Sequence, residues 1–97
     1  MSRATPERFE DRVLAIVRAT APGDVLTYGE IAAEAGSPGA ARAVGNVMAR
    51  SGADVPWWRV VTSNGRLVPG HETRQSRRLR AEGVTVANGR VTTVTVT

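Results

Sequence analysis

The chain has 97 residues, a length that fits one compact domain with one or two surface sites rather than a multidomain enzyme. With 41% hydrophobic and 23% charged residues, the composition is that of an ordinary globular protein and excludes a disordered or fibrous chain. The absence of cysteine excludes disulfides, thiolate metal sites and sulfur nucleophiles, and a single histidine, His71, argues against a zinc site or a Ser-His-Asp triad.

The net charge of +4 is unevenly distributed. Residues 1–36 carry four arginines against six acidic residues, whereas residues 37–97 carry nine arginines against three acidic residues. This basic second part makes nucleic acid the leading partner. No apolar run approaches the roughly 20 residues of a membrane span, and the N-terminus lacks a secretory signal. We therefore expect no membrane association and a cytoplasmic protein, associated with the nucleoid when it binds DNA.

The first two helices are predicted from capping signals and apolar spacing. Thr5-Pro6-Glu7 is typical of a helix N-terminus. The apolar residues that follow recur with helical spacing and predict one buried face: Phe9, Val13, Ile16 and Val17. The helix is expected to end before Ala21-Pro22-Gly23. A second helix is predicted to begin at a capping box formed by Thr27 and Glu30 and to end at Gly36.

A third helix is predicted to begin at a Ser37 cap, with Pro38 in its first turn, and to run from Ala40 to Arg50. Its packing side carries Ala40, Ala41, Val44, Val47 and Met48, and its other side carries Arg42, Gly45, Asn46 and Ala49. Such small residues around a single arginine favour a face that a partner's backbone or groove approaches closely, although an alanine-rich surface helix is the alternative. The tight turn between the second and third helices is typical of a helix-turn-helix.

The remaining chain combines strands with one helix. Residues 55–61 are predicted to lead into a strand, and Asn64-Gly65 predicts a hairpin whose return strand follows directly. A helix is predicted over 74–82. Asn88-Gly89 predicts a second hairpin near the C-terminus.

Three segments together resemble a known family. They are Gly23–Ala32 (GDVLTYGEIA), Gly36–Gly45 (GSPGAARAVG) and Pro56–Val61 (PWWRVV). In order and spacing they look like the DNA-binding domain of O6-alkylguanine-DNA alkyltransferases, over about three quarters of the chain. The resemblance implies one domain over residues 1–97 with an α+β, mainly helical fold, a winged helix-turn-helix-like DNA-binding domain with short β-hairpins.

The expected nucleophile of that family is replaced. Its enzymes place a reactive Cys and an assisting His between the Pro and the Arg of a Pro-Cys-His-Arg-Val motif, where this chain has Trp57 and Trp58. An indole has no ionisable nucleophile to accept an alkyl group. The chain therefore resembles the non-enzymatic, alkyltransferase-like branch, in which a Trp commonly replaces the Cys. Members of that branch usually keep the His, so Trp58 departs from the pattern.

The resemblance implies a non-catalytic DNA damage sensor without cofactor or metal. It would bind duplex DNA that contains O6-alkylguanine, flip the damaged nucleotide into a Trp-lined pocket and mark it for nucleotide excision repair. A helix-turn-helix transcription regulator derived from such a domain is one alternative, although small residues on the third helix cannot read base edges. An enzyme with relocated chemistry is the other. We expect a monomer, which suits the flipping of a single base.

The implied DNA contacts are Tyr28, Gly39, Ala40, Arg42, Ala43, Gly45 and Asn46. Tyr28 matches the residue that crowds the phosphate beside the target nucleotide and helps to rotate it outward. Arg42 matches the residue that enters the base stack through the minor groove, and its small neighbours allow close approach. Asn46 matches an Asn that braces the turn before the Pro-Trp motif.

The implied lesion pocket consists of Tyr28, Pro56, Trp57, Trp58, Arg59 and Arg74. Arg59 is expected to connect the Pro-Trp motif to neighbouring segments. Glu82 matches a buried structural Glu that, in the family's enzymes, supports the assisting His, which this chain lacks. The candidates for contact with the flipped base are Arg66, His71 and Arg74, of which we choose Arg74 for a cation–π contact. For three of these features a purely structural role remains open: Trp58 as a core aromatic, His71 as a loop residue, and the arginines at 74–80 as a solvent-exposed helix face.

Overall fold

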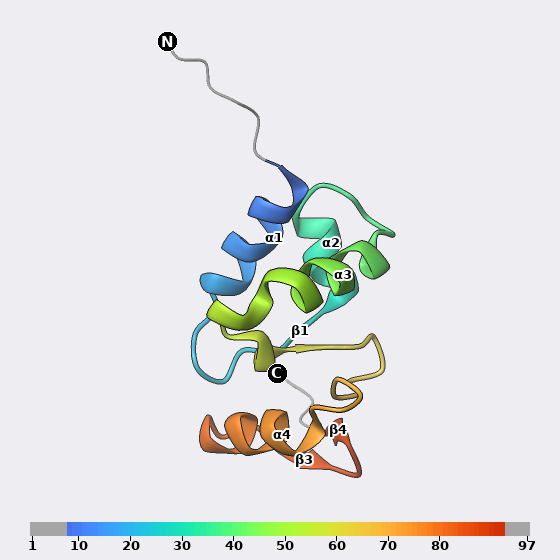
Figure 1. The fold of residues 1–97 in the computed structure, drawn as a ribbon. Helices are drawn as coiled ribbons and strands as arrows, with labels where there is room; N and C mark the ends of the chain where they lie inside the picture. Colours follow the sequence, from blue (N-terminus) through green and yellow to red (C-terminus); the bar gives the residue numbers. More distant parts are fainter. Residues whose placement is uncertain (1–7, 93–97) are drawn as a thin grey trace, which may run out of the picture.

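Three helices form the upper part of the molecule in Figure 1, and a fourth helix with a short hairpin forms the lower part. The structure is a computed structural model that describes residues 8–92. The elements in chain order are α1 (Phe9–Arg18), β1 (Leu26–Thr27), α2 (Tyr28–Glu34), α3 (Ala41–Ser51), η1 (Gly52–Asp54), η2 (Trp57–Arg59), β2 (Val60–Val61), α4 (Glu72–Ala81), β3 (Val86–Ala87) and β4 (Arg90–Val91). The longest helix among residues 8–92 has 11 residues, and none of the helices described there is long and apolar enough to cross a membrane.

Helix α1 presents the predicted apolar face to the core. Val13 and Val17 are completely buried, and Phe9 and Ile16 pack against the same cluster. The helix begins at Phe9, after Arg8 in extended conformation. The predicted start at residues 5–7 lies outside the described residues.

Helix α2 begins and ends as predicted. The Thr27 hydroxyl accepts a hydrogen bond from the Glu30 backbone N–H at 3.0 Å, and the Glu30 carboxylate accepts one from the Thr27 N–H at 2.8 Å. This is the predicted capping box. At the other end Gly36 adopts a φ of +91°, a left-handed conformation that ends the helix.

The predicted start of the third helix is wrong. Helix α3 begins at Ala41, and its N-cap residue, Ala40, makes no side-chain capping bond. Instead, the Ala40 N–H donates to the Ser37 carbonyl at 3.0 Å, and Gly39 has a φ of +90°. Pro followed by a left-handed Gly is typical of the central positions of a type II turn, so Pro38 belongs to a turn and not to the helix.

Apolar residues from α1, α2, α3 and the segment after α3 form the larger core cluster: Val13, Val17, Ile31, Ala32, Ala35, Val44, Val47, Val55 and Val60. The predicted packing side of α3 contributes two of them, Val44 and Val47. A second cluster lies between α4, the loop before it and the C-terminal hairpin: Val61, Leu67, Leu79, Val84 and Val86.

A short parallel pairing brings two distant segments together. Leu26 pairs with Val60, and Thr27 pairs with Val61. Residues 55–61 do lead into a strand as predicted, but only the last two of them form it, because residues 57–59 form a 3₁₀ turn. The pairing places Tyr28, the first residue of α2, next to the segment that follows the two tryptophans.

The two predicted hairpins have different outcomes. The Asn88-Gly89 hairpin is confirmed, since β3 pairs antiparallel with β4 and both turn residues have positive φ, 56° and 72°. The part predicted beyond residue 92 lies outside the described residues. Asn64-Gly65 does form a turn, across which the Thr62 N–H donates to the Arg66 carbonyl at 3.0 Å, but residues 65–67 then bond to residues 89–91 and do not pair with β2. Helix α4 begins at Glu72, two residues before its predicted start.

Candidate nucleic-acid interface

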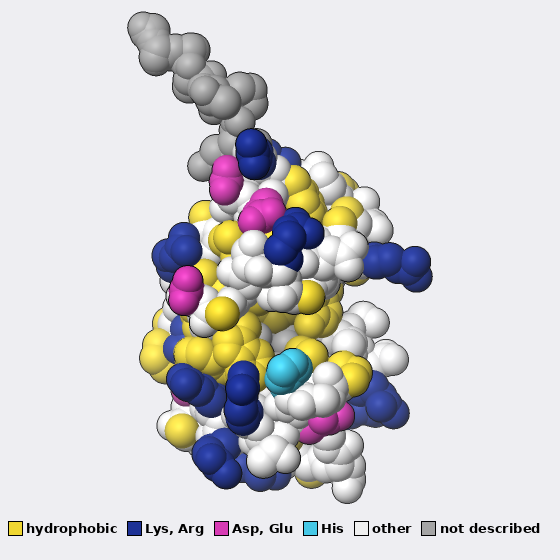
Figure 2. All heavy atoms as spheres, in the orientation of Figure 1, with side chains coloured by type: hydrophobic (Ala, Val, Ile, Leu, Met, Phe, Trp, Pro, Cys, Tyr) yellow, Lys and Arg dark blue, Asp and Glu magenta, His cyan; other side chains and the backbone are white. Residues whose placement is uncertain are grey.

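A cavity of about 260 Å³ lies between the upper helices and α4. It is lined by Tyr28, Gly45, Met48, Ala49, Ala53, Trp57, Val68, His71 and Arg74. Figure 2 shows hydrophobic surface around the histidine in the hollow between the two parts of the molecule, with arginines on the lower part. The lining is mainly apolar and contains no carboxylate. Such a site suits an uncharged planar ligand more than a metal or a cation.

Trp57 lies at the centre of a ring cluster in this cavity. Its ring centre lies 5.8 Å from that of His71, with an angle of 62° between the planes. The Arg74 Cζ lies 5.4 Å from the centre of the Trp57 ring, within the range of a cation–π contact. The structure thus brings Trp57 and Arg74 together, and it adds His71, which the sequence left as a secondary candidate.

Trp58 does not line the cavity. Its ring is nearly perpendicular to that of Trp57, at 84°, and its indole Nε1 donates a hydrogen bond to Glu82 Oε2 at 2.8 Å. The Arg78 Cζ lies 4.4 Å from its ring centre on the α4 side. Successive residues of a 3₁₀ turn point about 120° apart, so neighbouring tryptophans face different surroundings. This geometry corresponds to the packing role that the sequence had left open for Trp58.

Pro56 and Arg59 are likewise absent from the cavity lining. Arg59 is buried and forms a bidentate ion pair with Glu82, from Nε to Oε1 at 3.0 Å and from Nη2 to Oε2 at 2.8 Å. Its Nη1 also donates to the Thr20 carbonyl at 2.9 Å. The predicted pocket therefore divides into a cavity around Trp57 and a polar support behind it.

Glu82 accepts hydrogen bonds from three residues in two segments of the chain. Besides Arg59 and Trp58, the Gly23 N–H donates to its Oε1 at 3.0 Å. These interactions, above all the one with Arg59, lower the pKa of the Glu82 carboxyl to about 2. The carboxylate is therefore ionised at neutral pH and holds the turn of residues 57–59 against α4.

Gln75 is a functional candidate that the sequence analysis missed. It is completely buried, its Oε1 accepts from the Val68 N–H at 2.7 Å, and its Nε2 donates to the carbonyls of Trp58 at 3.1 Å and Val60 at 2.9 Å. It thus holds one wall of the cavity, Val68, against the tryptophan turn. The signal was its position four residues before Leu79, on the same face of α4 as that apolar anchor.

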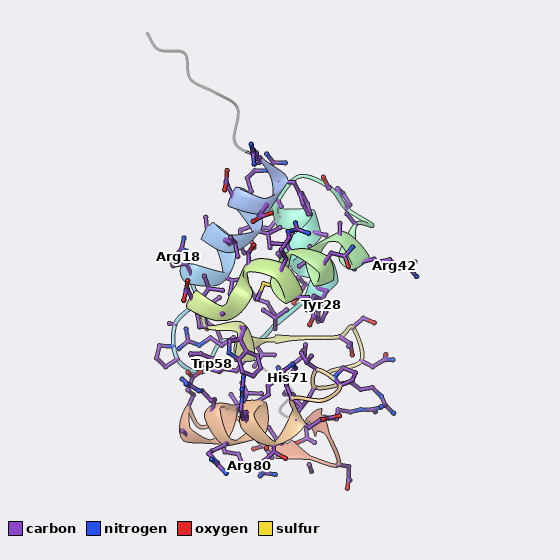
Figure 3. All side chains as sticks on the ribbon, viewed as in Figure 1. Arg18, Tyr28, Arg42, Trp58, His71 and Arg80 are labelled. Carbon is purple, nitrogen blue, oxygen red and sulfur yellow. The ribbon has the colours of Figure 1, made fainter. Side chains whose placement is uncertain are left out.

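Tyr28 is predicted both to contact DNA and to line the lesion pocket. It is half-buried, it lines the cavity, and it follows directly on the β1 strand that pairs with β2. Burial raises the pKa of its phenol, so the hydroxyl is neutral at physiological pH and can donate a hydrogen bond. Figure 3 shows Tyr28 on the side of the molecule from which Arg42 projects.

The outer surface of α3 carries the remaining predicted DNA contacts. Arg42 and Asn46 are exposed, as is Gly39 in the preceding turn, whereas Ala40, Ala43 and Gly45 are half-buried. Arg42 extends away from the body of the molecule in Figure 3. The predicted brace by Asn46 is not formed, because no hydrogen bond joins its side chain to any of residues 8–92. It lies on the outward side of α3 instead.

All four arginines at positions 74–80 are exposed, but three of them have defined contacts. Arg74 and Arg78 lie over the two tryptophans, and Arg80 donates to the Val86 carbonyl at 2.7 Å.

In the part of the chain that the structure describes, no three His, Asp or Glu side chains are grouped so as to hold a metal ion.

The helix-turn-helix, with an aromatic cavity beside its second helix, defines a DNA-binding domain of the alkyltransferase type. Residues 8–84 match the family described as 6-O-methylguanine DNA methyltransferase, DNA binding domain, and the chain belongs to this family. The predicted resemblance and the predicted fold class are confirmed.

Individual relatives and a solved structure are similar to this chain over most of its length. The chain is 39% identical to a DNA base-flipping protein of Vibrio parahaemolyticus over 85 residues, which cover 84% of this chain and 85% of the relative. It is 46% identical to a DNA base-flipping protein of Escherichia coli over 85 residues, which cover 84% of this chain and 66% of that one. Its structure is similar to that of S. pombe Atl1 in complex with damaged DNA containing O6-carboxymethylguanine, with a TM-score of 0.74 and 39% identity over 81% of this chain and 79% of Atl1.

Proposed function

We propose that this chain is a non-catalytic DNA damage sensor that binds O6-alkylguanine in duplex DNA and holds the flipped base in the cavity at Trp57. The observation that carries the proposal is that Trp57 lines the cavity. By the resemblance of the segment Pro56–Val61, Trp57 occupies the position of the nucleophilic Cys in the family's enzymes. Since the sequence has no cysteine, no thiolate is present to accept the alkyl group. The base-flipping relatives and the Atl1 complex with damaged DNA support the same function.

Selectivity for the damaged base follows from the energetics of extrusion. Unpairing and unstacking a nucleotide costs a few kcal/mol, and the cost is lower when the base pairs badly. Stacking against an aromatic side chain returns about 1–3 kcal/mol. An alkyl group on O6 weakens guanine pairing, and the apolar lining of the cavity, including Met48, Ala49 and Val68, accepts that group without an unsatisfied polar partner.

The surface outside the cavity would extrude and replace the base. Arg42, which extends from α3, would fill the vacated space in the stack through the minor groove. Tyr28 would press on the adjacent phosphate from the edge of the cavity. The small residues Gly39, Ala40, Ala43 and Gly45 would let α3 approach the groove closely.

A protein that binds a lesion without removing it must pass it to other proteins. We therefore extend the proposal to nucleotide excision repair proteins as downstream partners. The protein would act in the cytoplasm on nucleoid DNA. We expect it to act as a monomer, because one cavity accommodates one base.

A direct test compares the affinity for two duplexes that differ only in one O6-methylguanine, by fluorescence anisotropy. We expect tighter binding to the damaged duplex and loss of this preference in Trp57→Ala, with Arg18→Gln as a control on the opposite side from Arg42. Equal affinities in the wild type would overturn the proposal and favour a transcription regulator. Intact-protein mass spectrometry after incubation completes the test, since an added alkyl group would indicate an enzyme.

A further inference from the structure

Arg66 and Arg90 face each other across an isolated antiparallel bridge. The bridge is held by two flanking backbone hydrogen bonds, from the Leu67 N–H to the Gly89 carbonyl at 3.0 Å and from the Val91 N–H to the Gly65 carbonyl at 2.8 Å. These bonds make the arginines a non-hydrogen-bonded pair, the type in which opposed side chains lie closest, with Cα atoms about 4.5 Å apart. Both side chains leave the same face of the bridge.

The pair has no acidic partner in the described part of the chain. Both arginines are exposed, and neither guanidinium forms a hydrogen bond or ion pair with any of residues 8–92. Glu30 lines a hollow next to Gly65, but its carboxylate is occupied by the cap of Thr27. Like charges placed directly opposite each other destabilise a strand pair, so this arrangement favours an anion that both guanidinium groups can share.

The position of Gly65 keeps the pair close. A Cβ at Gly65 would lie 3.5 Å from the Arg90 Cγ and 3.2 Å from the Val91 carbonyl oxygen. The stem of Arg90 therefore lies against the Gly65 backbone, which limits its freedom. Arg66 lies within the residues matched by the family, whereas Arg90 and the rest of β4 lie beyond residue 84, where that match ends.

The pair lies close along the chain to the cavity at Trp57. Along the segment after Gly65, Leu67 is buried in the lower core, whereas Arg66 is exposed and Val68 lines the cavity. Arg66 is therefore two residues, or about 7 Å along the chain, from a residue that lines the cavity. A duplex whose flipped base enters the cavity would bring its backbone near the pair.

We infer that Arg66 and Arg90 form a two-arginine clamp for a phosphate of the DNA backbone beside the lesion cavity. The clamp rests on the proposed function only in requiring that the chain binds duplex DNA. It contacts no base, so it contributes affinity and register but no preference for damage. It lies in the loop and hairpin that follow the tryptophan turn, separate from the helix-turn-helix.

The test uses the salt dependence of binding to an undamaged duplex. The slope of log affinity against log salt concentration decreases by about 0.9 for each phosphate that is no longer neutralised. We expect the double variant Arg66→Gln/Arg90→Gln to lose a slope of about 0.9 or more, while the ratio of affinities for damaged and undamaged duplexes is unchanged. Arg8→Gln/Arg18→Gln, which removes two exposed arginines at the two ends of α1, is the matched control for the loss of two charges.

Two further variants separate a phosphate contact from a folding effect. Arg66→Lys/Arg90→Lys keeps both charges and should keep the wild-type slope. Arg90→Glu creates an opposite-charge pair with Arg66, so it should unfold at the same temperature as the wild type or higher and still lose the slope. A slope in Arg66→Gln/Arg90→Gln no smaller than that of Arg8→Gln/Arg18→Gln would overturn the clamp. If the wild type binds damaged and undamaged duplexes with equal affinity, the proposed function is refuted, but the clamp is not.

Discussion

The guanidinium of Arg59 binds the carboxylate of Glu82 through two hydrogen bonds, from Nε to Oε1 at 3.0 Å and from Nη2 to Oε2 at 2.8 Å. The side chains are only 8% and 13% exposed. The pair connects the tryptophan turn η2 to the C-terminal end of α4, because Glu82 is the C-cap residue of that helix. The support of the cavity is therefore an ion pair shielded from water, and its strength governs how firmly Trp57 is positioned.

Replacement of Glu82 by Gln should destabilise the fold strongly. The variant leaves the buried Arg59 charge without its counter-ion, which costs about 3 kcal/mol, near the lower end for buried pairs because Glu82 keeps some exposure. The matched control is Glu10→Gln, which breaks a solvent-exposed ion pair with Arg50, whose side chains are 35% (Glu10) and 59% (Arg50) exposed, and should destabilise the fold far less than Glu82→Gln. Denaturant unfolding at pH 7 measures both losses. Equal losses would contradict the supporting role of Glu82.

The same carboxylate should make stability depend on acid. The folded-state pKa of Glu82 is about 2, below its ordinary value of 4.5, so its stabilisation is fully present above about pH 5. It is lost as the pH falls from about 5 towards 2, because the unfolded chain takes up the proton first. The loss should amount to about 2–3 kcal/mol. Unfolding curves across this range should show a smaller decrease for Glu82→Gln than for the wild type, and parallel curves would rule out this explanation.

Local rules predicted local elements well. The capping box at Thr27 and the hairpin at Asn88-Gly89 depend on a few neighbouring residues, and both are present. The predictions of local structure were wrong where the same residues are compatible with two different structures. Pro38 is acceptable in a first helical turn and in a type II turn, and the Gly that follows it decides for the turn. The segment after Gly65 bonds to β4, a choice set by the second core cluster and not by the turn itself.

The site could be predicted only in part for a similar reason. A sequence places Trp57 and Trp58 side by side, but the 3₁₀ turn sends one into the cavity and the other to Glu82. Gln75 lies among arginines and looks like part of a polar surface, whereas the fold buries it completely. Its partners are backbone groups of distant segments, and no pattern of residue types encodes such contacts.

Gln75→Leu should weaken both stability and damage recognition. The change leaves the buried Val60 carbonyl and the partly buried Trp58 carbonyl and Val68 N–H without their partner, which should cost about 3 kcal/mol. It also releases Val68 from the tryptophan turn, so the preference for O6-methylguanine should decrease even where the protein is fully folded. Ser76→Ala, the neighbouring position with an exposed bond to Thr73, should change neither quantity. Normal damage preference in folded Gln75→Leu would show that the residue is structural only.

Arg42→Ala should reduce base extrusion. The exposed arginine would fill the space left by the flipped base, so its loss should weaken binding to damaged and undamaged duplexes alike, by about tenfold or 1.4 kcal/mol. The fluorescence of a 2-aminopurine at the target position should fall at saturating protein, because the base remains stacked. Arg18→Ala provides the control for charge. Unchanged fluorescence in Arg42→Ala at saturation would remove the wedge role.

Trp57→Cys should not create an efficient alkyltransferase, although it places a thiol beside the cavity. Transfer of a methyl group from guanine O6 to Sγ requires a base that takes the thiol proton. The indole of Trp58 is a donor only, and its N–H is already bound to Glu82. In Trp57→Cys/Trp58→His an imidazole would donate to that carboxylate through one nitrogen and accept the thiol proton with the other, so slow methylation should appear. Mass spectrometry with an O6-methylguanine duplex distinguishes the variants, and methylation of the single variant at the rate of the double would refute this explanation.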